Sequence, residues 1–186
     1  MGSSVLATAA PGSKAILNFT SKHNPDTMYG HGIMTEGAKD AHVHDFVFSS
    51  NLTFPAKSAP GNAGLVFRVS NPGPGVDEYR GYYAGIEWAG VDSVARLVLG
   101  TADNDWRLIS AANLGVASKP SFAIKVQAVG SWIKIFVDDW KKPVIRVKNN
   151  KYRSGRVGLR TFNVEVKYSN IGLKRIPQLS GKKSAM

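Results

Sequence analysis

The sequence has no cysteine among its 186 residues. This absence excludes disulfide bonds, zinc sites built on thiolates and cysteine nucleophiles. The sequence also lacks any apolar run near the roughly 20 residues that a membrane-spanning helix needs, so we expect no membrane span. Glycine and aromatic residues are plentiful, with 19 Gly, 8 Phe, 6 Tyr and 4 Trp. This composition favours a turn-rich, strand-rich domain with its own core over a helical bundle.

Acidic residues are scarce in the last third of the chain. Residues 121–186 hold 15 of the 24 basic residues and only 3 of the 13 acidic ones. The formal net charge of +11 therefore comes from one region, which argues against a general nucleic-acid-binding coat. Residues 141–160 contain eight basic residues and no acidic one, and the cations there alternate with apolar residues. We expect them to line the outward face of paired late strands.

No segment has the periodicity of an amphipathic helix. From residue 41 onward, apolar and polar residues alternate with the period of two that is typical of half-buried strands. Residues 64–69, for example, are expected to place Phe67 and Val69 on one face and Arg68 on the other. Roughly ten such strands, separated by turn signals and without crossover helices, predict an all-β fold. The expected architecture is a two-sheet antiparallel β-sandwich, or jelly roll.

The chain length favours a single β-sandwich domain over residues 1–186. We expect an irregular N-terminal arm over residues 1–40, with one short strand from Ala15 to Phe19, and a flexible basic tail over residues 178–186. No standard signal peptide is visible. Two glycosylation sequons, at Asn18 and Asn51, nevertheless fit a secreted, extracellular protein that is stabilised by its core rather than by disulfide bonds.

Four segments carry a family resemblance through their order and spacing. They are residues 61–68 (GNAGLVFR), 78–86 (EYRGYYAGI), 124–138 and 152–160 (YRSGRVGLR). Together they resemble the concanavalin A-like lectin/glucanase superfamily over about residues 45–173. The most similar branches are carbohydrate-binding module family 66, which binds levan and other fructans, and the 3-keto-disaccharide hydrolase-type domains.

The resemblance implies a concanavalin A-like sandwich and an oligo- or polysaccharide ligand, with a fructan as one candidate. The basic late strands add an anionic glycan as the other candidate. Two departures separate the chain from the family pattern, one that concerns metal or sugar binding and one that concerns catalysis. Asn149 stands where members often have an acidic residue. Tyr83 and Gly85 stand where the hydrolase-type branch usually has an acidic and an amide residue.

Sugar binding needs aromatic faces for the ring and planar charged groups for pairs of hydroxyls. Arg68 and Glu87 occupy polar positions of two successive strands, and Tyr83 shares the face of Glu87. If these strands pair, as sequence neighbours usually do, Arg68 lies beside Tyr83 or Glu87. These three residues are the principal site hypothesis. The alternative is an Arg–Glu ion pair on a solvated sheet face.

Tryptophan residues supply the stacking candidates. Trp88 closes a strand and is expected to rim a pocket, and Trp106 opens a strand after an Asp-Asn-Asp turn. Arg160 is a further candidate for the ligand face. Trp132 lies inside an alternating strand, so we expect it to pack against neighbours. Asp77 falls in a Pro/Gly loop that could reach a ligand, although a solvated side chain is the simpler interpretation.

No catalytic or metal-binding motif is recognised. A glycosidase needs two carboxyl groups at a set separation, and Glu87 is alone in its strand. Asp103 and Asp105 resemble a fragment of a calcium loop, but two carboxylates are too few for a site. His42 and His44 share a strand face without a third ligand in view. We therefore expect no cofactor and no metal.

Three functions remain open from the sequence. The first is non-catalytic carbohydrate binding by one sheet face of a lectin-like sandwich. The second is a polysaccharide lyase or glycoside hydrolase on the same scaffold, with Tyr83, His44 and Arg68 as candidate lyase residues. The third is an interaction domain that docks an acidic partner through the basic C-terminal third. Nucleic acid is not the expected partner.

Overall fold

The computed structural model describes residues 19–21, 33–35, 42–55, 59–72 and 77–177. These residues form twelve β-strands, and they include no helix that could cross a membrane. The predicted tail, residues 178–186, and most of the predicted arm, residues 1–40, lie outside the described residues.

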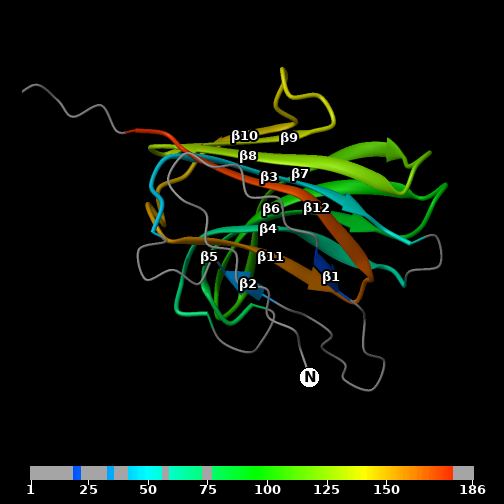
Figure 1. Cartoon of the computed structure of the whole chain (residues 1–186), viewed down its shortest axis with the longest axis horizontal. Coiled ribbons are helices and arrows are strands. Elements are labelled where there is room, and N and C mark those ends of the chain that lie inside the picture. The colour runs from blue at the N-terminus through cyan, green and yellow to red at the C-terminus, as the bar shows by residue number, and fades with distance from the viewer. Residues whose placement is uncertain (1–18, 22–32, 36–41, 56–58, 73–76, 178–186) are drawn as a thin grey trace, which may run out of the picture.

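The strands form two antiparallel sheets that lie one over the other (Figure 1). Sheet A contains, in spatial order, β1 (Phe19–Ser21), β12 (Val166–Arg175), β3 (Phe46–Thr53), β8 (Ser121–Val129), β9 (Trp132–Val137) and β10 (Ile145–Lys148). Sheet B contains β2 (Ile33–Thr35), β11 (Arg156–Phe162), β4 (Gly61–Ser70), β5 (Arg80–Trp88), β6 (Val94–Asp103) and β7 (Trp106–Val116). The predicted all-β, two-sheet antiparallel sandwich is confirmed.

The core lies between the sheets and follows from the alternation in the sequence. Every second residue of β3 is buried, and β8 repeats this pattern over most of its length. Strands β4 to β7 pair in chain order, as expected for a meander. The largest side chains of this inter-sheet core are Phe46, Phe48, Phe54, Phe67, Tyr82, Trp88, Phe122 and Tyr168.

The expectation about the basic run of residues 141–160 is wrong. It does not line one face, because β10 belongs to sheet A and β11 to sheet B. The intervening chain passes from one sheet to the other and divides the cations between them.

The expected strand from Ala15 to Phe19 lies outside the described residues except for Phe19. The described part of the arm contains β1 and β2, which add to opposite sheets, β1 beside β12 and β2 beside β11.

The predicted alternation also fails in β4, at a β-bulge between Phe67 and Ser70. Arg68 has a left-handed backbone at this bulge, with φ of 51°. Bulges re-aim a side chain and shift the phase of a strand. Val69 consequently lies on the outer face of sheet B with Val66, rather than in the inter-sheet core with Phe67.

The re-aimed Arg68 side chain ties three segments of the sandwich together. Its side chain is only 1% exposed. Nη2 donates hydrogen bonds to the carbonyl oxygens of His44 (2.9 Å) and Gly130 (2.8 Å), and Nη1 donates to that of Tyr152 (3.1 Å). These carbonyls lie before β3, in the β8–β9 turn and between β10 and β11.

The charge of Arg68 is partly balanced by Asp45, whose Oδ1 lies 3.8 Å from Nη2 and also accepts the Gly130 N–H. Burial lowers the pKa of the Arg68 guanidinium below its ordinary value. Arginine nevertheless stays charged in proteins, because its ordinary pKa is so high. We therefore assign Arg68 to the fold rather than to a ligand.

Replacing Arg68 tests this assignment. Arg68→Met leaves three carbonyl oxygens without their donor, so we expect the free energy of unfolding to fall by about 3 kcal/mol. Urea denaturation measures the change. Arg96→Met is the matched control, because that arginine is exposed and its ion pair is a surface one. An equally small change in both variants would show that Arg68 does not hold the sandwich together.

Candidate functional site

The structure separates the residues of the principal sequence hypothesis. Arg68 lies at the bulge and binds backbone carbonyls, so it does not lie beside Tyr83 or Glu87 as expected. Glu87 does share the outer face of sheet B with Tyr83, but its partner is Arg96, with Nε 2.6 Å from Oε2. The Arg–Glu pair considered as an alternative therefore exists with a different arginine.

Trp88 is also misplaced by the sequence hypothesis. It is 2% exposed, and its ring stacks on Phe54 in the inter-sheet core with 4.9 Å between centroids. The alternation of β5 explains this, since Trp88 has the same phase as Tyr82 and Ile86, which are core residues. The expectation that Trp88 rims a pocket is wrong.

The other three candidates, Tyr83, Trp106 and Arg160, come together on the outer face of sheet B. Glycines beneath the rings make this possible. A Cβ at Gly85 would collide with the Tyr83 hydroxyl, and one at Gly100 would collide with the Trp106 indole. The two rings therefore lie close to the sheet and meet edge to face, with centroids 5.7 Å apart.

Arg160 from β11 covers the Tyr83 ring. Its guanidinium carbon lies 4.4 Å from the ring centroid, a cation–π contact. Nη1 donates to Asn62 Oδ1 (2.6 Å) and Nη2 donates to Asp77 Oδ1 (3.0 Å). The Arg160 side chain is 6% exposed, whereas the Asp77 side chain is 25% exposed. The guanidinium is thus fixed in one orientation at the sheet surface.

Asn62 links the members of this group. Its Oδ1 accepts hydrogen bonds from both Arg160 Nη1 and the Tyr83 hydroxyl, the latter at 3.0 Å. Because both contacts use the oxygen, the amide nitrogen of Asn62 keeps its two N–H donors for another partner.

Tyr168 positions the backbone of Arg160 from the opposite sheet. Its hydroxyl donates to the Arg160 carbonyl oxygen (2.6 Å) and accepts the Gly64 N–H (3.1 Å). Gly64 and Arg160 are Cα partners in neighbouring strands, so one phenol joins β4 and β11 at the level of the site. Burial raises the pKa of Tyr168 well above its ordinary value, which keeps this donor protonated.

Tyr79 adds an unsatisfied donor to the same face. It is fully buried and packs with Tyr83 and Val98 in the outer cluster. Its hydroxyl is the buried side-chain group that has no hydrogen-bond partner among the described residues. Burial raises its pKa, while the nearby Arg160 charge lowers it and that of Asp77 raises it. An orphaned buried hydroxyl is destabilising by about 1–3 kcal/mol unless a ligand satisfies it.

The sequence hypothesis missed Asn62 and Tyr79 as site residues. The available signal was the pair of glycines, Gly85 and Gly100, at outward positions of adjacent strands, because such glycines make room for something to lie on a sheet. The sequence places Asp77 in a loop that could reach a ligand, but only the folded chain brings this loop to β11.

Asn149, the departure from the family pattern, has a structural role in this chain. Its Oδ1 accepts the Tyr82 hydroxyl (2.7 Å) and the Lys151 N–H (3.0 Å). No group of three or more His, Cys, Asp or Glu side chains that could hold a metal ion occurs within the described ranges. The chemistry of this face therefore consists of planar hydrogen-bonding groups beside aromatic rings.

Buried tyrosines give the fold an expected pH limit. Burial raises the pKa of Tyr79, Tyr83 and Tyr168 above the ordinary value of 10.0. Their contribution to stability is therefore fully present below pH 10 and is lost as the pH rises above it, because only the unfolded chain ionises them readily. We expect phenolate absorbance in an alkaline titration to rise in step with the loss of β-sheet circular dichroism. Ionisation of all tyrosines before unfolding would contradict this burial.

Comparisons with known proteins bear on the fold. No protein-family model and no curated protein sequence matches the chain. Solved structures do match. The carbohydrate-binding module CBM66 from Bacillus subtilis has a TM-score of 0.65 at 19% identity, over 84% of this chain and 94% of that one.

Two lectin-type structures are also similar. A legume lectin-like domain from Entamoeba histolytica has a TM-score of 0.56 at 10% identity, over 88% of this chain and 90% of that one. The exoplasmic/lumenal domain of VIP36, in a form bound to Ca²⁺ and Man3GlcNAc, has a TM-score of 0.61 at 11% identity, over 88% of this chain and 84% of that one. The chain therefore has the concanavalin A-like lectin/glucanase fold.

Proposed function

We propose that this protein binds an oligo- or polysaccharide on the outer face of sheet B without catalysing its conversion. The observation that carries the proposal is the Arg160 guanidinium, held over the Tyr83 ring by Asn62 and Asp77 and flanked by Trp106. Similar solved structures include a carbohydrate-binding module and a lectin-like domain, which supports the same class of ligand.

The polar groups of this face suit vicinal hydroxyls. The planar guanidinium and a carboxylate can each make two charge-assisted hydrogen bonds, and such bonds are stronger than neutral ones. The partly exposed Asp77 side chain offers acceptors, and the amide nitrogen of Asn62 offers donors. Because these groups are already fixed by one another, little ordering is needed on binding.

Trp106 supplies the apolar component. Its ring lies across Gly100 and against Tyr83, and the side chain is half-buried. The position leaves part of the indole accessible beside the polar groups. A sugar ring has an apolar C–H face as well as hydroxyls, so adjacent aromatic and planar polar groups match both of its surfaces.

The same geometry argues against catalysis. The candidate lyase residues are dispersed, since Arg68 binds the His44 carbonyl at the bulge while Tyr83 lies on the outer face. Burial raises the pKa of Tyr83, which makes it a poor general base near neutral pH. Asp77 pairs with Arg160 and Glu87 pairs with Arg96, so these carboxylates contact arginines rather than each other, unlike the carboxyl pair of a glycosidase.

The test is a glycan array that includes fructans, followed by titration calorimetry with the best ligand at low and moderate salt. We expect binding that survives moderate salt, because the ligand is held by hydrogen bonds and stacking. Arg160→Lys keeps the charge but loses the planar fork, and Trp106→Ala loses the ring. Each substitution is expected to weaken binding about tenfold or more. For Arg160→Lys this corresponds to the loss of one charge-assisted hydrogen bond.

Arg96→Ala is the matched control, because Arg96 is an exposed arginine next to β5 whose partner is Glu87. It should leave the affinity unchanged. Absence of any ligand on a broad array would refute the proposal. Release of new reducing ends or of unsaturated uronates would replace it with the hydrolase or lyase alternative.

A further inference from the structure

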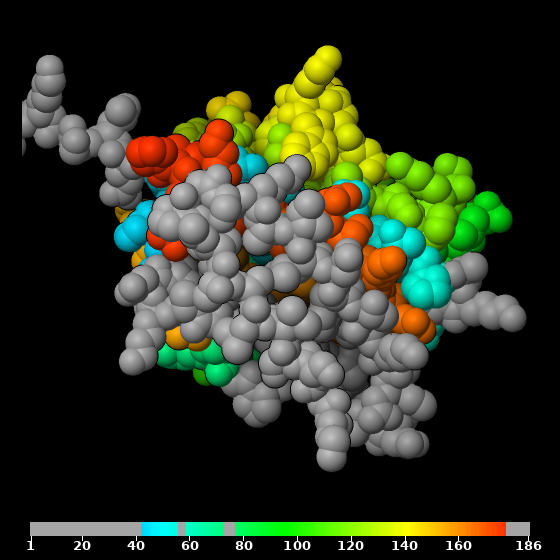
Figure 2. Space-filling view, in the orientation of Figure 1, coloured from blue at the N-terminus to red at the C-terminus, as the bar shows by residue number. Residues whose placement is uncertain are grey.

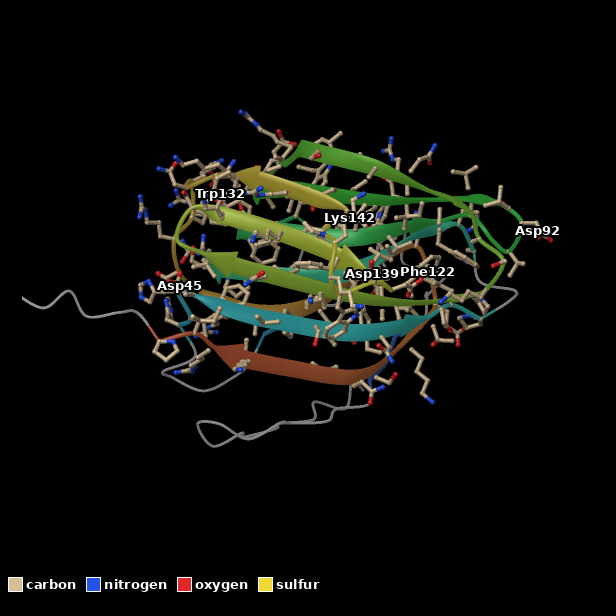
Figure 3. The ribbon with its side chains drawn as sticks, turned by 90° about the horizontal axis from the view of Figure 1, so that it is seen from above. Asp45, Asp92, Phe122, Trp132, Asp139 and Lys142 are labelled. Atoms are coloured by element: carbon tan, nitrogen blue, oxygen red, sulfur yellow. The ribbon has the colours of Figure 1, made fainter. Side chains whose placement is uncertain are left out.

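The outer face of sheet A carries a second chemical surface that the sugar site on sheet B does not use. Strands β8, β9 and β10 contain no Asp or Glu, but four basic residues, Lys125, Lys134, Arg146 and Lys148. Figure 3 looks onto this face, with Trp132 by the β8–β9 turn and Lys142 from the β9–β10 loop. That loop projects from the molecule in the space-filling view (Figure 2).

The register of the strands places these residues in rows. One row runs Val129, Trp132, Lys148 across β8, β9 and β10, and the next runs Gln127, Lys134, Arg146. Between them is a shallow hollow of about 210 Å³, lined by Gln127, Val129, Trp132, Lys134 and Arg146. An amide, an aromatic ring and two cations therefore face one space.

The pairing of Lys134 with Arg146 is unfavourable for the isolated fold. They are direct Cα partners on neighbouring strands, and like charges in that position destabilise a sheet. Within the described residues, no carboxylate forms an ion pair with Lys134, Arg146 or Lys148. An external anion would relieve this repulsion.

The acidic residues nearest in sequence are already engaged. Asp138 Oδ2 lies 3.2 Å from Lys119 Nζ, and its Oδ1 accepts the Ala123 N–H. Asp139 accepts the Lys141 N–H within its own loop. Neither of these two carboxylates therefore forms an ion pair with Lys134 or Arg146.

Trp132 provides an exposed ring at the same place. The sequence predicted that it packs against neighbours, but its side chain is 41% exposed. The Arg146 guanidinium lies 4.5 Å from the ring centroid, which holds the indole in place while the rest of the ring stays accessible.

We propose that this hollow binds an anionic polysaccharide. A sugar ring would lie on Trp132, and its carboxylate or sulfate would pair with Arg146 and Lys134. Gln127 would hydrogen-bond a hydroxyl. The surface is separate from the Arg160 face, because the two occupy outer faces of different sheets, so the inference stands independently of the function proposed above.

Other polyanions fit this surface less well. Single-stranded nucleic acid is held by several rings on which successive bases stack, and the hollow offers one. Trp140 is also exposed, but it does not line the hollow, and Lys125 Nζ lies 4.6 Å from its centroid. A lipid surface needs several projecting apolar side chains, whereas the hollow offers only Val129 and Trp132, beside two cations and an amide.

The test compares four probes by titration calorimetry. They are a heparin oligosaccharide, an oligogalacturonate, oligothymidylate and vesicles containing phosphatidylserine. We expect the wild-type protein to bind at least one of the two acidic saccharides, with an affinity that falls as salt rises. Arg146→Gln and Trp132→Ala should each weaken this binding about tenfold. Arg146→Gln should not lower the unfolding midpoint, because it removes a like-charge pair.

Arg107→Gln is the charge-matched control, since Arg107 is an exposed arginine on sheet B. Arg107→Gln should leave binding of the acidic saccharide unchanged. Arg160→Lys should also leave it unchanged, which separates this site from the sugar site of sheet B. The proposal is overturned if neither acidic saccharide binds or if the Trp132 and Arg146 variants bind as tightly as wild type. Tighter binding of oligothymidylate or of vesicles through the same residues would also overturn it.

Discussion

The burial of one guanidinium governs the outer face of sheet B. Arg160 is almost fully covered there, and a charged group can be buried only if its N–H donors are satisfied and its charge is paired. Asn62 and Asp77 supply those contacts, the Tyr83 ring supplies a surface, and Tyr168 fixes the backbone through the core. These contacts fix the Arg160 guanidinium and its neighbours before any ligand arrives. A site that binds uncharged hydroxyls needs such rigidity, because little ordering then opposes binding.

The two buried arginines, Arg68 and Arg160, show how context assigns different roles to one residue type. Arg68 donates to backbone carbonyls from three segments and leaves nothing for a ligand. Arg160 donates to two side chains at the sheet surface, one of which is partly exposed. Sequence periodicity placed both on polar phases of strands, and only the bulge in β4 distinguishes them.

Much of the fold could be predicted from the sequence, because period-two alternation and turn residues are local signals. The meander of sheet B and the inward phase of β8 and β9 follow directly from them. The prediction failed where a non-local or irregular feature decided the outcome: the bulge that turns Val69 outward, and the crossover that sends β10 and β11 to different sheets. Trp88 was expected to rim a pocket but lies in the core, whereas Trp132 was expected to pack against neighbours but is exposed. Sequence alternation shows that the two faces of a strand differ but not which face is covered. The contacts of Asp77 depend on long-range folding and left no local signal.

The topology likewise divides the basic residues between the two sheets. On sheet B, Arg160 forms an ion pair with Asp77, whereas on sheet A Lys134, Arg146 and Lys148 form no ion pair with a carboxylate in the described part of the chain. The account's central claim is that Arg160 and Trp106 form the sugar site. A crystal structure of the protein with its tightest glycan ligand tests that claim most directly. The account predicts a sugar ring against Trp106, with hydroxyls bonded to Arg160, Asp77 or Asn62. A ligand found elsewhere, with the Arg160 face empty, would contradict it.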